Sequence, residues 1–238
     1  ERRICIGGMA KGSGMIHPSM ATMLSYITCD AGVDYLTWSK MIKRVAKSSF
    51  NAITVDGDTS TNDAFLAFSS GAKLDRKYLP NLEEGLHLTA QFLAKAIARD
   101  GEGANCLLEI KVEGAVSDND AHIIARTIAS SSLVKTAVHG SDPNWGRIIA
   151  ALGRAGSPFN LNDVKLWIGP YKIFSEGTSL DFDRLLVSNF MRARLKGDYL
   201  VDDIITIRLR VGQGIHSATA WGCDLSDKYV RINADYTT

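Results

Sequence analysis

The sequence predicts an α/β protein, more closely an α+β layered sandwich, and three observations support this fold class. Strand-like runs alternate along the chain with amphipathic helices, a pattern typical of layered mixed folds. No internal repeat, low-complexity tract or proline-rich linker divides the 238 residues. The apolar fraction of 45% and the charged fraction of 22% are those of an ordinary globular protein, so the chain can bury a sizeable core as one large or two small domains.

The helices are predicted from apolar stripes and from capping residues. The clearest helix covers residues 80–100, where apolar side chains recur at helical spacing and Gly101 is placed to end it. Thr37 or Ser39 can cap an earlier helix, whose outward basic residues are best explained as a solvated face. The predicted helices cover residues 38–50, 80–100, 117–138 and 182–195.

The strands are predicted from short apolar or alternating runs. Alternation is clearest over residues 203–211, and Gly169 with Pro170 can turn a hairpin between two short strands. The predicted strands cover residues 20–27, 50–55, 105–114, 148–152, 164–168, 171–174, 203–211, 215–222 and 229–236.

Composition gives no reason to expect nucleic acid or a membrane as a partner. The formal net charge is +1, and no apolar run approaches the length of a membrane span, which is about 20 residues. The first residues lack the apolar core of a signal peptide.

The four cysteines show neither C-x-x-C pairing nor zinc-site spacing, so we expect reduced, mostly buried thiols. The five histidines are scattered, and we predict no metal site.

Residues 11–24, KGSGMIHPSMATML, place a glycine-rich turn before a candidate hydroxyl nucleophile, Thr22. A threonine hydroxyl needs a base, and its own α-amine, with a pKa of about 7.7 to 8.0, can serve if the bond between Ala21 and Thr22 is cut. Local pattern alone is explained more simply by a β-forming threonine at the start of a strand.

Two further polar segments have a structural and a functional explanation. Residues 54–63, TVDGDTSTND, are either a loop of turn formers with a helix cap or a part of the active site. Residues 142–147, DPNWGR, form a tight turn in which Arg147 can anchor an ion pair, and their turn chemistry favours a structural role.

Residues 11–24 resemble the self-cleavage junction of the ornithine acetyltransferase family, the bifunctional glutamate N-acetyltransferases of arginine biosynthesis. Further blocks resemble the family in the same order and extend the resemblance to the end of the chain. They are residues 54–63, residues 100–104 (DGEGA), residues 142–147, residues 221–225 (WGCDL) and residues 229–238 (YVRINADYTT).

The resemblance implies a DmpA/ArgJ-like fold with N-terminal-nucleophile character and self-cleavage between Ala21 and Thr22. Residues 1–21 are then the end of an α part, and residues 22–238 are the β chain, a single catalytic domain. Family members carry a substantial N-terminal half before the junction, so we expect this chain to be the nucleophile-bearing half of a larger precursor. In the family, the N-terminal half supplies the oxyanion hole through a Thr-Gly pair. We therefore expect this chain alone to be inactive.

The implied enzyme is an acyltransferase that moves acetyl from N2-acetyl-L-ornithine to L-glutamate through an acetyl-threonine intermediate on Thr22. It needs no cofactor, although some members accept acetyl-CoA as the acetyl donor. By resemblance Lys11, Thr22, Glu102, Asn233 and Thr238 bind substrate, with Glu102 as a counter-charge. Taken alone, Lys11 is typical of a surface lysine, Glu102 of a solvated turn and Asn233 of a strand end.

The implied assembly is a heterotetramer of two α and two β chains, in the cytoplasm, or in a plastid if the source is a plant. Two other function classes remain open. One is an N-terminal-nucleophile amidohydrolase or aminopeptidase, which would use the same threonine with water as the acceptor. The other is an uncleaved, non-catalytic remnant of the fold.

Overall fold

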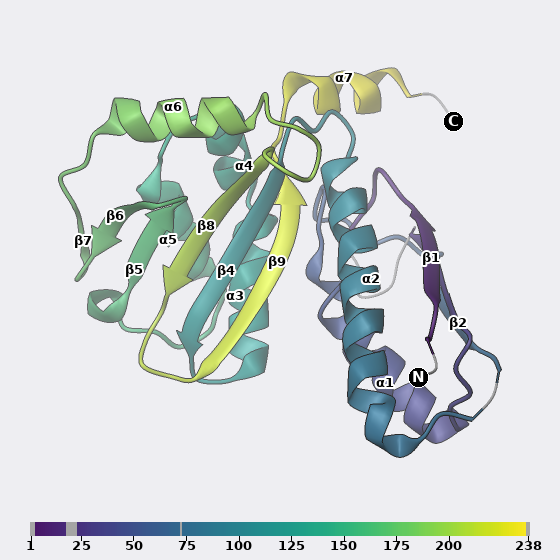
Figure 1. Ribbon diagram of the computed structural model, residues 1–238. Coiled ribbons are helices and arrows are strands. Elements are labelled where there is room, and N and C mark those ends of the chain that lie inside the picture. The colour runs from purple at the N-terminus through teal and green to yellow at the C-terminus, as the bar shows by residue number, and fades with distance from the viewer. Residues whose placement is uncertain (1–2, 18–22, 72, 237–238) are drawn as a thin grey trace. The chain divides into compact units, whose positions relative to one another are not determined.

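A computed structural model describes residues 3–17, 23–71 and 73–236 of the chain (Figure 1). The chain forms two compact units, residues 1–97 and residues 98–238. Both combine helices with a sheet, and the α/β class predicted from the sequence is confirmed. The predicted division at the Ala21–Thr22 bond concerns a covalent cut and stays a prediction.

The first unit contains a three-stranded sheet in the order β1-β2-β3. β1 (Ile6–Lys11) pairs antiparallel with β2 (Leu24–Cys29), and β2 pairs parallel with β3 (Ala64–Ser69). In the antiparallel register Lys11, the last residue of β1, lies opposite Leu24, the first residue of β2. The connection between the two strands therefore starts and ends at the same end of the strand pair.

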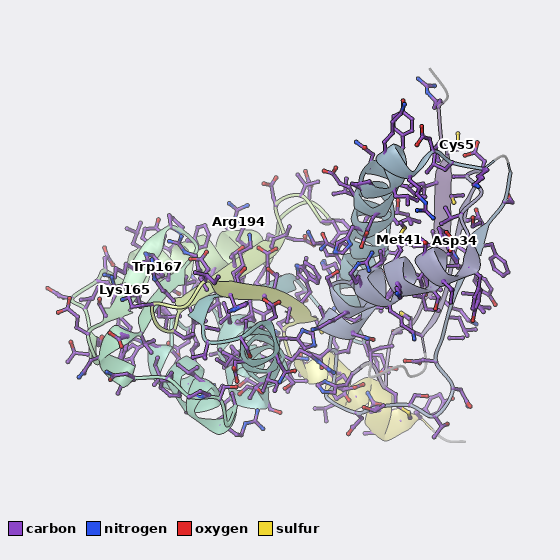
Figure 2. All side chains as sticks on the ribbon, turned by 90° about the horizontal axis from the view of Figure 1, so that it is seen from below. Cys5, Asp34, Met41, Lys165, Trp167 and Arg194 are labelled. Carbon is purple, nitrogen blue, oxygen red and sulfur yellow. The ribbon has the colours of Figure 1, made fainter. Side chains whose placement is uncertain are left out.

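Two helices accompany this sheet. α1 (Tyr35–Lys47) begins at Asp34, whose carboxylate accepts a hydrogen bond from the Thr37 nitrogen at 3.0 Å, and it buries Met41 (Figure 2). The predicted cap at Thr37 or Ser39 was therefore wrong by about one turn, because Asp34 satisfies the free backbone donors of the first turn. α2 (Leu79–Arg99) agrees with the prediction. Two short 3₁₀ turns, Phe50–Ala52 and Arg76–Tyr78, precede β3 and α2 respectively.

The second unit contains a six-stranded sheet in the order β7-β6-β5-β8-β4-β9. β4 (Leu107–Ala115), the longest strand, lies next to the edge strand β9 (His216–Cys223); it is antiparallel to β9 and parallel to β8 (Ile204–Arg210). β5 (Lys165–Ile168) pairs with β8 and forms the predicted hairpin with β6 (Tyr171–Ser175). The two-residue strand β7 (Thr178–Ser179) completes the sheet beside β6.

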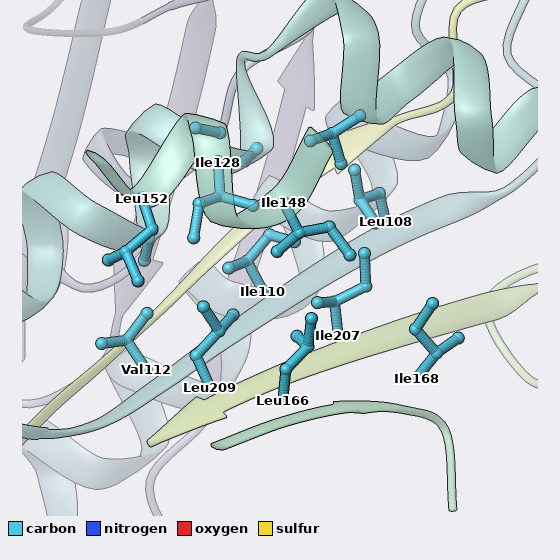
Figure 3. Packing of buried hydrophobic residues seen from close by; sticks show 14 of the residues in the cluster. Leu108, Ile110, Val112, Ile128, Ile148, Leu152, Leu166, Ile168, Ile207 and Leu209 are labelled. Carbon is cyan, nitrogen blue, oxygen red and sulfur yellow. The ribbon is translucent and has the colours of Figure 1, made fainter. Parts of the chain in front are cut away.

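Helices α3 (Asp118–Ala129), α4 (Ser132–His139) and α5 (Trp145–Arg154) follow β4 in the chain. Apolar side chains of the sheet meet those of α3 and α5 in one buried cluster (Figure 3). Leu108, Ile110 and Ile207 from the strands lie close to Ile128 and Ile148 from the helices. This core follows the period-two alternation of β4 and β8 and the helical stripes opposite them.

Helix α6 (Arg184–Arg194) matches the predicted helix over residues 182–195, and it buries Val187 and Met191. Helix α7 (Asp227–Asp235) follows β9 near the end of the chain (Figure 1). Among the helices of the described ranges, none is both long and apolar enough to cross a bilayer.

Two predicted strands were wrong, because the segments are helices. Residues 148–152 lie in α5, where Ile148, Ala151 and Leu152 are buried at spacings of three and four, and the Asn144 side chain caps the Arg147 nitrogen at 3.1 Å. Residues 229–236 overlap α7, in which Arg231 pairs with Asp227 one turn earlier. A short apolar run fits either period, so its pattern alone does not distinguish a strand from a helix.

Two smaller predictions were also wrong, and one strand was missed. Residues 50–55 begin with a 3₁₀ turn instead of a strand, and the predicted helix over residues 117–138 is two helices that break at Ser130 and Ser131. The sequence did not predict β3, because its stabilising neighbour is β2, about 40 residues earlier in the chain.

Candidate functional site

The structure describes three of the six residues predicted for cleavage or substrate binding. Lys11 is exposed at the end of β1 in the first unit, and Glu102 and Asn233 lie in the second unit. Ala21, Thr22 and Thr238 lie outside the described residues. The described residues that flank residues 18–22 are residues 15–17 on one side and Met23 on the other.

On the N-terminal side of these residues, Asp56 holds the backbone. Its carboxylate accepts hydrogen bonds from the nitrogen of Met15 at 2.6 Å and from the nitrogen of Ile16 at 3.0 Å. The Val55 nitrogen donates to the Ile16 carbonyl at 2.6 Å, and the Ile16 side chain is fully buried. Met15 has a positive φ of 54°, which is uncommon for a residue with a side chain and shows how tightly this turn is held.

The next residue, His17, is held by the same polar loop. Its Nδ1 lies 2.9 Å from the Thr54 hydroxyl oxygen, and the Thr59 hydroxyl donates to its carbonyl at 3.0 Å. Five contacts therefore join residues 54–59 to the backbone or ring of residues 15–17, four from side chains and one from the Val55 backbone. None of them follows from sequence spacing, because the partners are about 40 residues apart.

On the C-terminal side, Asp63 binds the backbone of Met23. The Met23 nitrogen donates to Oδ1 of Asp63, and the Ala64 nitrogen donates to the Met23 carbonyl at 2.9 Å. The other carboxylate oxygen, Oδ2, is buried and has no hydrogen-bond partner among the described residues. Burial raises the pKa of the Asp63 carboxyl to about 6, although the Met23 N–H partly opposes this shift.

Residues 54–63 thus contact both flanks of the predicted cleavage junction. The sequence left open whether this block is only a loop or a part of the site, and its contacts favour the second. Asp56 and Asp63 are the residues that sequence reasoning did not single out. The only sequence feature that could have indicated them is their position, since each is an acidic residue near one end of a block of turn-forming residues.

In the second unit, Glu102 and Asn233 are direct partners. The Asn233 side-chain nitrogen donates to Oε2 of Glu102 at 2.8 Å and to the Tyr229 carbonyl at 3.0 Å. Asn233 therefore lies on a helix, not at the end of a strand as its sequence pattern suggested.

The loop that carries Glu102 packs closely against the start of α7. Gly103 has a φ of +71°, and a Cβ built on it would lie 2.6 Å from the Tyr229 nitrogen. The Ser226 hydroxyl donates to the Gly103 carbonyl at 2.6 Å. Only glycine permits both this backbone angle and this approach, which is why Glu102 can meet a side chain of α7.

A buried carboxylate fixes the other end of this loop. Asp224 accepts hydrogen bonds from the Asn105 backbone nitrogen at 2.7 Å and from the Asn105 side chain at 2.8 Å, and its Oδ2 lies 2.8 Å from His139 Nδ1. The Asp224 side chain is completely buried. The loop from residue 100 to residue 105 is thus tied to β9 and α4, as a positioned binding group requires.

The 142–147 block has a structural explanation. Arg147 donates from Nη1 to the Leu133 carbonyl at 2.9 Å and to the Thr136 hydroxyl at 3.0 Å, which joins α5 to α4. The predicted ion pair is instead made by Asp142, with Arg184 at 2.9 Å. These contacts agree with the structural role favoured from the sequence.

In the described ranges, no group of three or more His, Cys, Asp or Glu side chains is arranged to hold a metal ion. The cysteines are all free thiols, buried at Cys29, Cys106 and Cys223 and exposed at Cys5. Burial raises the pKa of the Cys29 and Cys106 thiols. Such thiols are poor nucleophiles near neutral pH, so they do not compete with a hydroxyl as the reactive group.

Comparison with known proteins gives consistent results. The model of the ArgJ family matches residues 1–238. An arginine biosynthesis bifunctional protein ArgJ from Prochlorococcus marinus (strain NATL2A) is 83% identical over 237 residues, which is all of this chain and 56% of the relative. The protein of the same name from Synechocystis sp. (strain PCC 6803) is 52% identical, and this chain covers 59% of it. The chain therefore spans a little more than half the length of these relatives.

A solved structure has the same fold. The crystal structure of the arginine biosynthesis bifunctional protein ArgJ from Bacillus halodurans aligns with a TM-score of 0.80 and 36% sequence identity. The alignment covers 88% of this chain and 97% of that chain.

Proposed function

Because the chain belongs to the ArgJ family, we propose that it is the nucleophile-bearing part of an acetyltransferase of arginine biosynthesis that moves acetyl from N2-acetyl-L-ornithine to L-glutamate. The observation that carries the proposal is the family match over the whole chain, which includes the junction of residues 11–24. The polar block that contacts both flanks of this junction supports it.

In the proposed reaction the Thr22 hydroxyl oxygen attacks the amide carbonyl of acetylornithine, and the α-amine of Thr22 takes the hydroxyl proton. Ornithine leaves with that proton, and an acetyl-threonine ester remains. The amine of glutamate then attacks the ester and releases N-acetylglutamate. Because the acetyl group stays on a covalent carrier between the two half-reactions, the kinetics are expected to be ping-pong.

This mechanism requires a cut between Ala21 and Thr22, which creates the free α-amine. The family match supports such a cut, because residues 11–24 resemble the self-cleavage junction of the family.

We propose that Lys11, Glu102, Asn233 and Thr238 bind the substrates. Both amino-acid substrates carry an α-carboxylate, for which the Lys11 ammonium is a suitable donor. The Asn233 nitrogen already donates to Glu102 and Tyr229, so its side-chain oxygen is the group that can accept a hydrogen bond from a substrate N–H. Glu102 supplies a negative charge for the side-chain ammonium of ornithine. The fixed loop around Gly103 supports this role, because it holds Glu102 beside Asn233.

We further propose that the N-terminal part carried by the relatives supplies the oxyanion donors, and that two α and two β chains assemble in the cytoplasm. Donors aimed at the developing oxyanion contribute strongly to acyl transfer. This chain alone is then inactive. No resident cofactor is required, and acetyl-CoA can serve as an alternative acetyl donor if the site accepts it.

The test is to produce the full-length precursor, with the N-terminal part of its relatives, and to measure intact mass and transfer kinetics. The expected result is a chain that begins at Thr22 and parallel double-reciprocal plots for acetylornithine and glutamate. Hydrolysis that exceeds transfer at saturating glutamate would instead identify an amidohydrolase. A folded precursor that stays uncut and inactive would identify a non-catalytic remnant.

A further inference from the structure

We propose that His139 is a positioning residue for substrate binding, which holds the Glu102 loop in place through the buried carboxylate of Asp224. The inference rests on the proposed function, since Glu102 is proposed there to bind the side-chain ammonium of acetylornithine. All three residues belong to the second unit and lie in its described part.

The first observation is the contact between His139 and Asp224. His139 is the last residue of α4, and its Nδ1 lies 2.8 Å from Oδ2 of Asp224. This oxygen also accepts a hydrogen bond from the Asn105 side chain, so it is an acceptor and Nδ1 is the donor. The Asp224 side chain is completely buried, whereas 39% of the His139 side chain is exposed. A buried carboxylate depends on each of its donors, so the loss of His139 would change how Asp224 is held.

The second observation is that the same carboxylate holds the loop. Oδ1 accepts hydrogen bonds from the backbone nitrogens of Asn105 at 2.7 Å and Cys106 at 3.3 Å, and Oδ2 accepts from the Asn105 side chain at 2.8 Å. His139 and Asn105 thus share Oδ2, and Nδ1 and the Asn105 side-chain nitrogen lie 3.4 Å apart. A carboxylate that turns after losing His139 would therefore also change its hydrogen bonds to the loop.

The third observation is the Ser226 hydroxyl. Ser226 lies at the N-cap of α7, where a serine side chain ordinarily accepts a hydrogen bond from a backbone nitrogen of the first turn. Here it makes no such cap, and its hydroxyl donates to the Gly103 carbonyl at 2.6 Å. The segment that carries Asp224 thus holds the loop at Gly103 as well as at Asn105, one and three residues after Glu102.

The fourth observation is that α4 binds this segment at two points. The Leu225 nitrogen donates to the Lys135 carbonyl at 3.3 Å, one helical turn before His139. The side chain of His139 and the backbone of Lys135 therefore hold residues 224–226 from the same side. A charged binding group needs such support, because a small displacement of its carboxylate weakens the contact with its ligand.

The experiment measures steady-state kinetics of the full-length enzyme with single substitutions at His139. His139→Leu removes the donor to Asp224. We expect KM for acetylornithine to rise about fivefold, in keeping with the two- to tenfold factor of one hydrogen bond, and kcat and KM for glutamate to change less than about twofold. His139→Asn should restore KM to within about twofold of the wild type, because its amide nitrogen is attached to Cγ, as Nδ1 is in histidine.

His216→Leu is the matched control. His216 Nδ1 also lies 2.8 Å from an aspartate oxygen, that of Asp118, and 37% of its side chain is exposed. It pairs with Ala115 at the far end of β4, about 25 Å along the strand from Leu107, where β4 leaves the Glu102 loop. We expect this variant to keep the wild-type KM for both substrates.

A double-mutant cycle separates positioning of Glu102 from a general effect on the fold. In an enzyme that already carries Glu102→Gln, the charge to be positioned is gone, so adding His139→Leu should leave KM for acetylornithine within about twofold. A further fivefold rise in that background would overturn the proposal, as would a wild-type KM in His139→Leu or a failure of His139→Asn to restore it.

The remaining outcomes are also decisive. If His139→Leu does not fold, His139→Ser replaces it, because serine is polar but too short to reach Asp224, and the same kinetics are expected. An active wild type whose KM for acetylornithine is unchanged by Glu102→Gln would overturn this inference and leave acetyl transfer intact. A correctly cut wild type without any acetyl transfer would overturn the proposed function itself.

Discussion

Asn233 and Glu102, 131 residues apart in sequence, are joined by a hydrogen bond of 2.8 Å between the Asn233 amide and the Glu102 carboxylate. The contact joins the loop after α2 to helix α7. Both residues were predicted to bind substrate, so the structure unites two predicted site residues within one unit.

Replacing Glu102 with Gln should affect the two substrates differently. Glutamine keeps an oxygen for Asn233 but removes the charge that is proposed to bind the ornithine ammonium. A hydrogen bond to a charged group contributes about 1.5 kcal/mol or more, so we expect KM for acetylornithine to rise about tenfold and KM for glutamate to change little. Steady-state kinetics of the full-length enzyme measure this. Glu113→Gln, at an exposed position of β4, is the control, and equal effects on both substrates would contradict the assignment.

Replacing Gly103 with Ala should destabilise the second unit and disturb the Glu102 loop. The new Cβ would lie 2.6 Å from the Tyr229 nitrogen, at a backbone angle that already disfavours alanine. Gly57→Ala is the control, because Gly57 also has a positive φ but has no atom within 4 Å of its Cβ position. We expect Gly57→Ala to lower the free energy of unfolding by about 1 kcal/mol and Gly103→Ala to lower it by more. Urea denaturation compares the two variants. Equal losses of unfolding free energy would contradict the prediction, because they would show that α7 moves away from the new methyl group at little cost.

Removing Arg99 should leave a buried charge without its partner. Arg99 binds Asp203, whose side chain is fully buried, and it also donates to the Ala104 carbonyl at 3.2 Å. We expect Arg99→Ala to lower the free energy of unfolding by about 3 kcal/mol, as for other broken buried pairs. Lys77→Ala, which breaks an exposed pair with Asp75, should cost less than about 1 kcal/mol. Chemical denaturation at neutral pH checks both variants.

The stability of the uncut chain should fall as the pH rises from about 4 to 6, in proportion to the ionisation of Asp63. Burial raises the pKa of this carboxyl to about 6 from its ordinary value of 3.8. The folded state then holds a proton that the unfolded state has lost, so the favourable contribution is complete below the unfolded pKa and is lost as the pH passes the folded one. Asp63→Asn should remove this part of the pH dependence, measured by denaturation at several pH values. If the free energy of unfolding has the same slope against pH in the wild type and in Asp63→Asn, the pKa of Asp63 is not raised in the folded state.

The regular elements with a long, local pattern could be predicted from the sequence. The stripe of residues 80–100 predicted α2, and turn chemistry predicted the hairpin of β5 and β6. Alternation predicted β8 and β9 within about one residue at each end. These signals are sufficient because hydrophobic periodicity and glycine or proline positions act within a few residues of each other.

Short or ambiguous segments required the tertiary structure. The run around Ile148 fits a strand or a helix equally well, and burial against the six-stranded sheet selects α5. β3 is stabilised mainly by pairing with β2, far away in sequence. In both cases packing outweighed local propensity, which differs by only about 1 kcal/mol per residue between alternatives.

The same division holds for the candidate site. The sequence, through its family motifs, determined the junction of residues 11–24 and the choice of Lys11, Glu102 and Asn233. The contact between Glu102 and Asn233, and the contacts of Asp56 and Asp63 with the two flanks of the junction, became visible only in the folded chain. The reason is physical: a hydrogen bond depends on distances of about 3 Å between groups that the chain brings together only on folding, and no spacing in sequence records those distances.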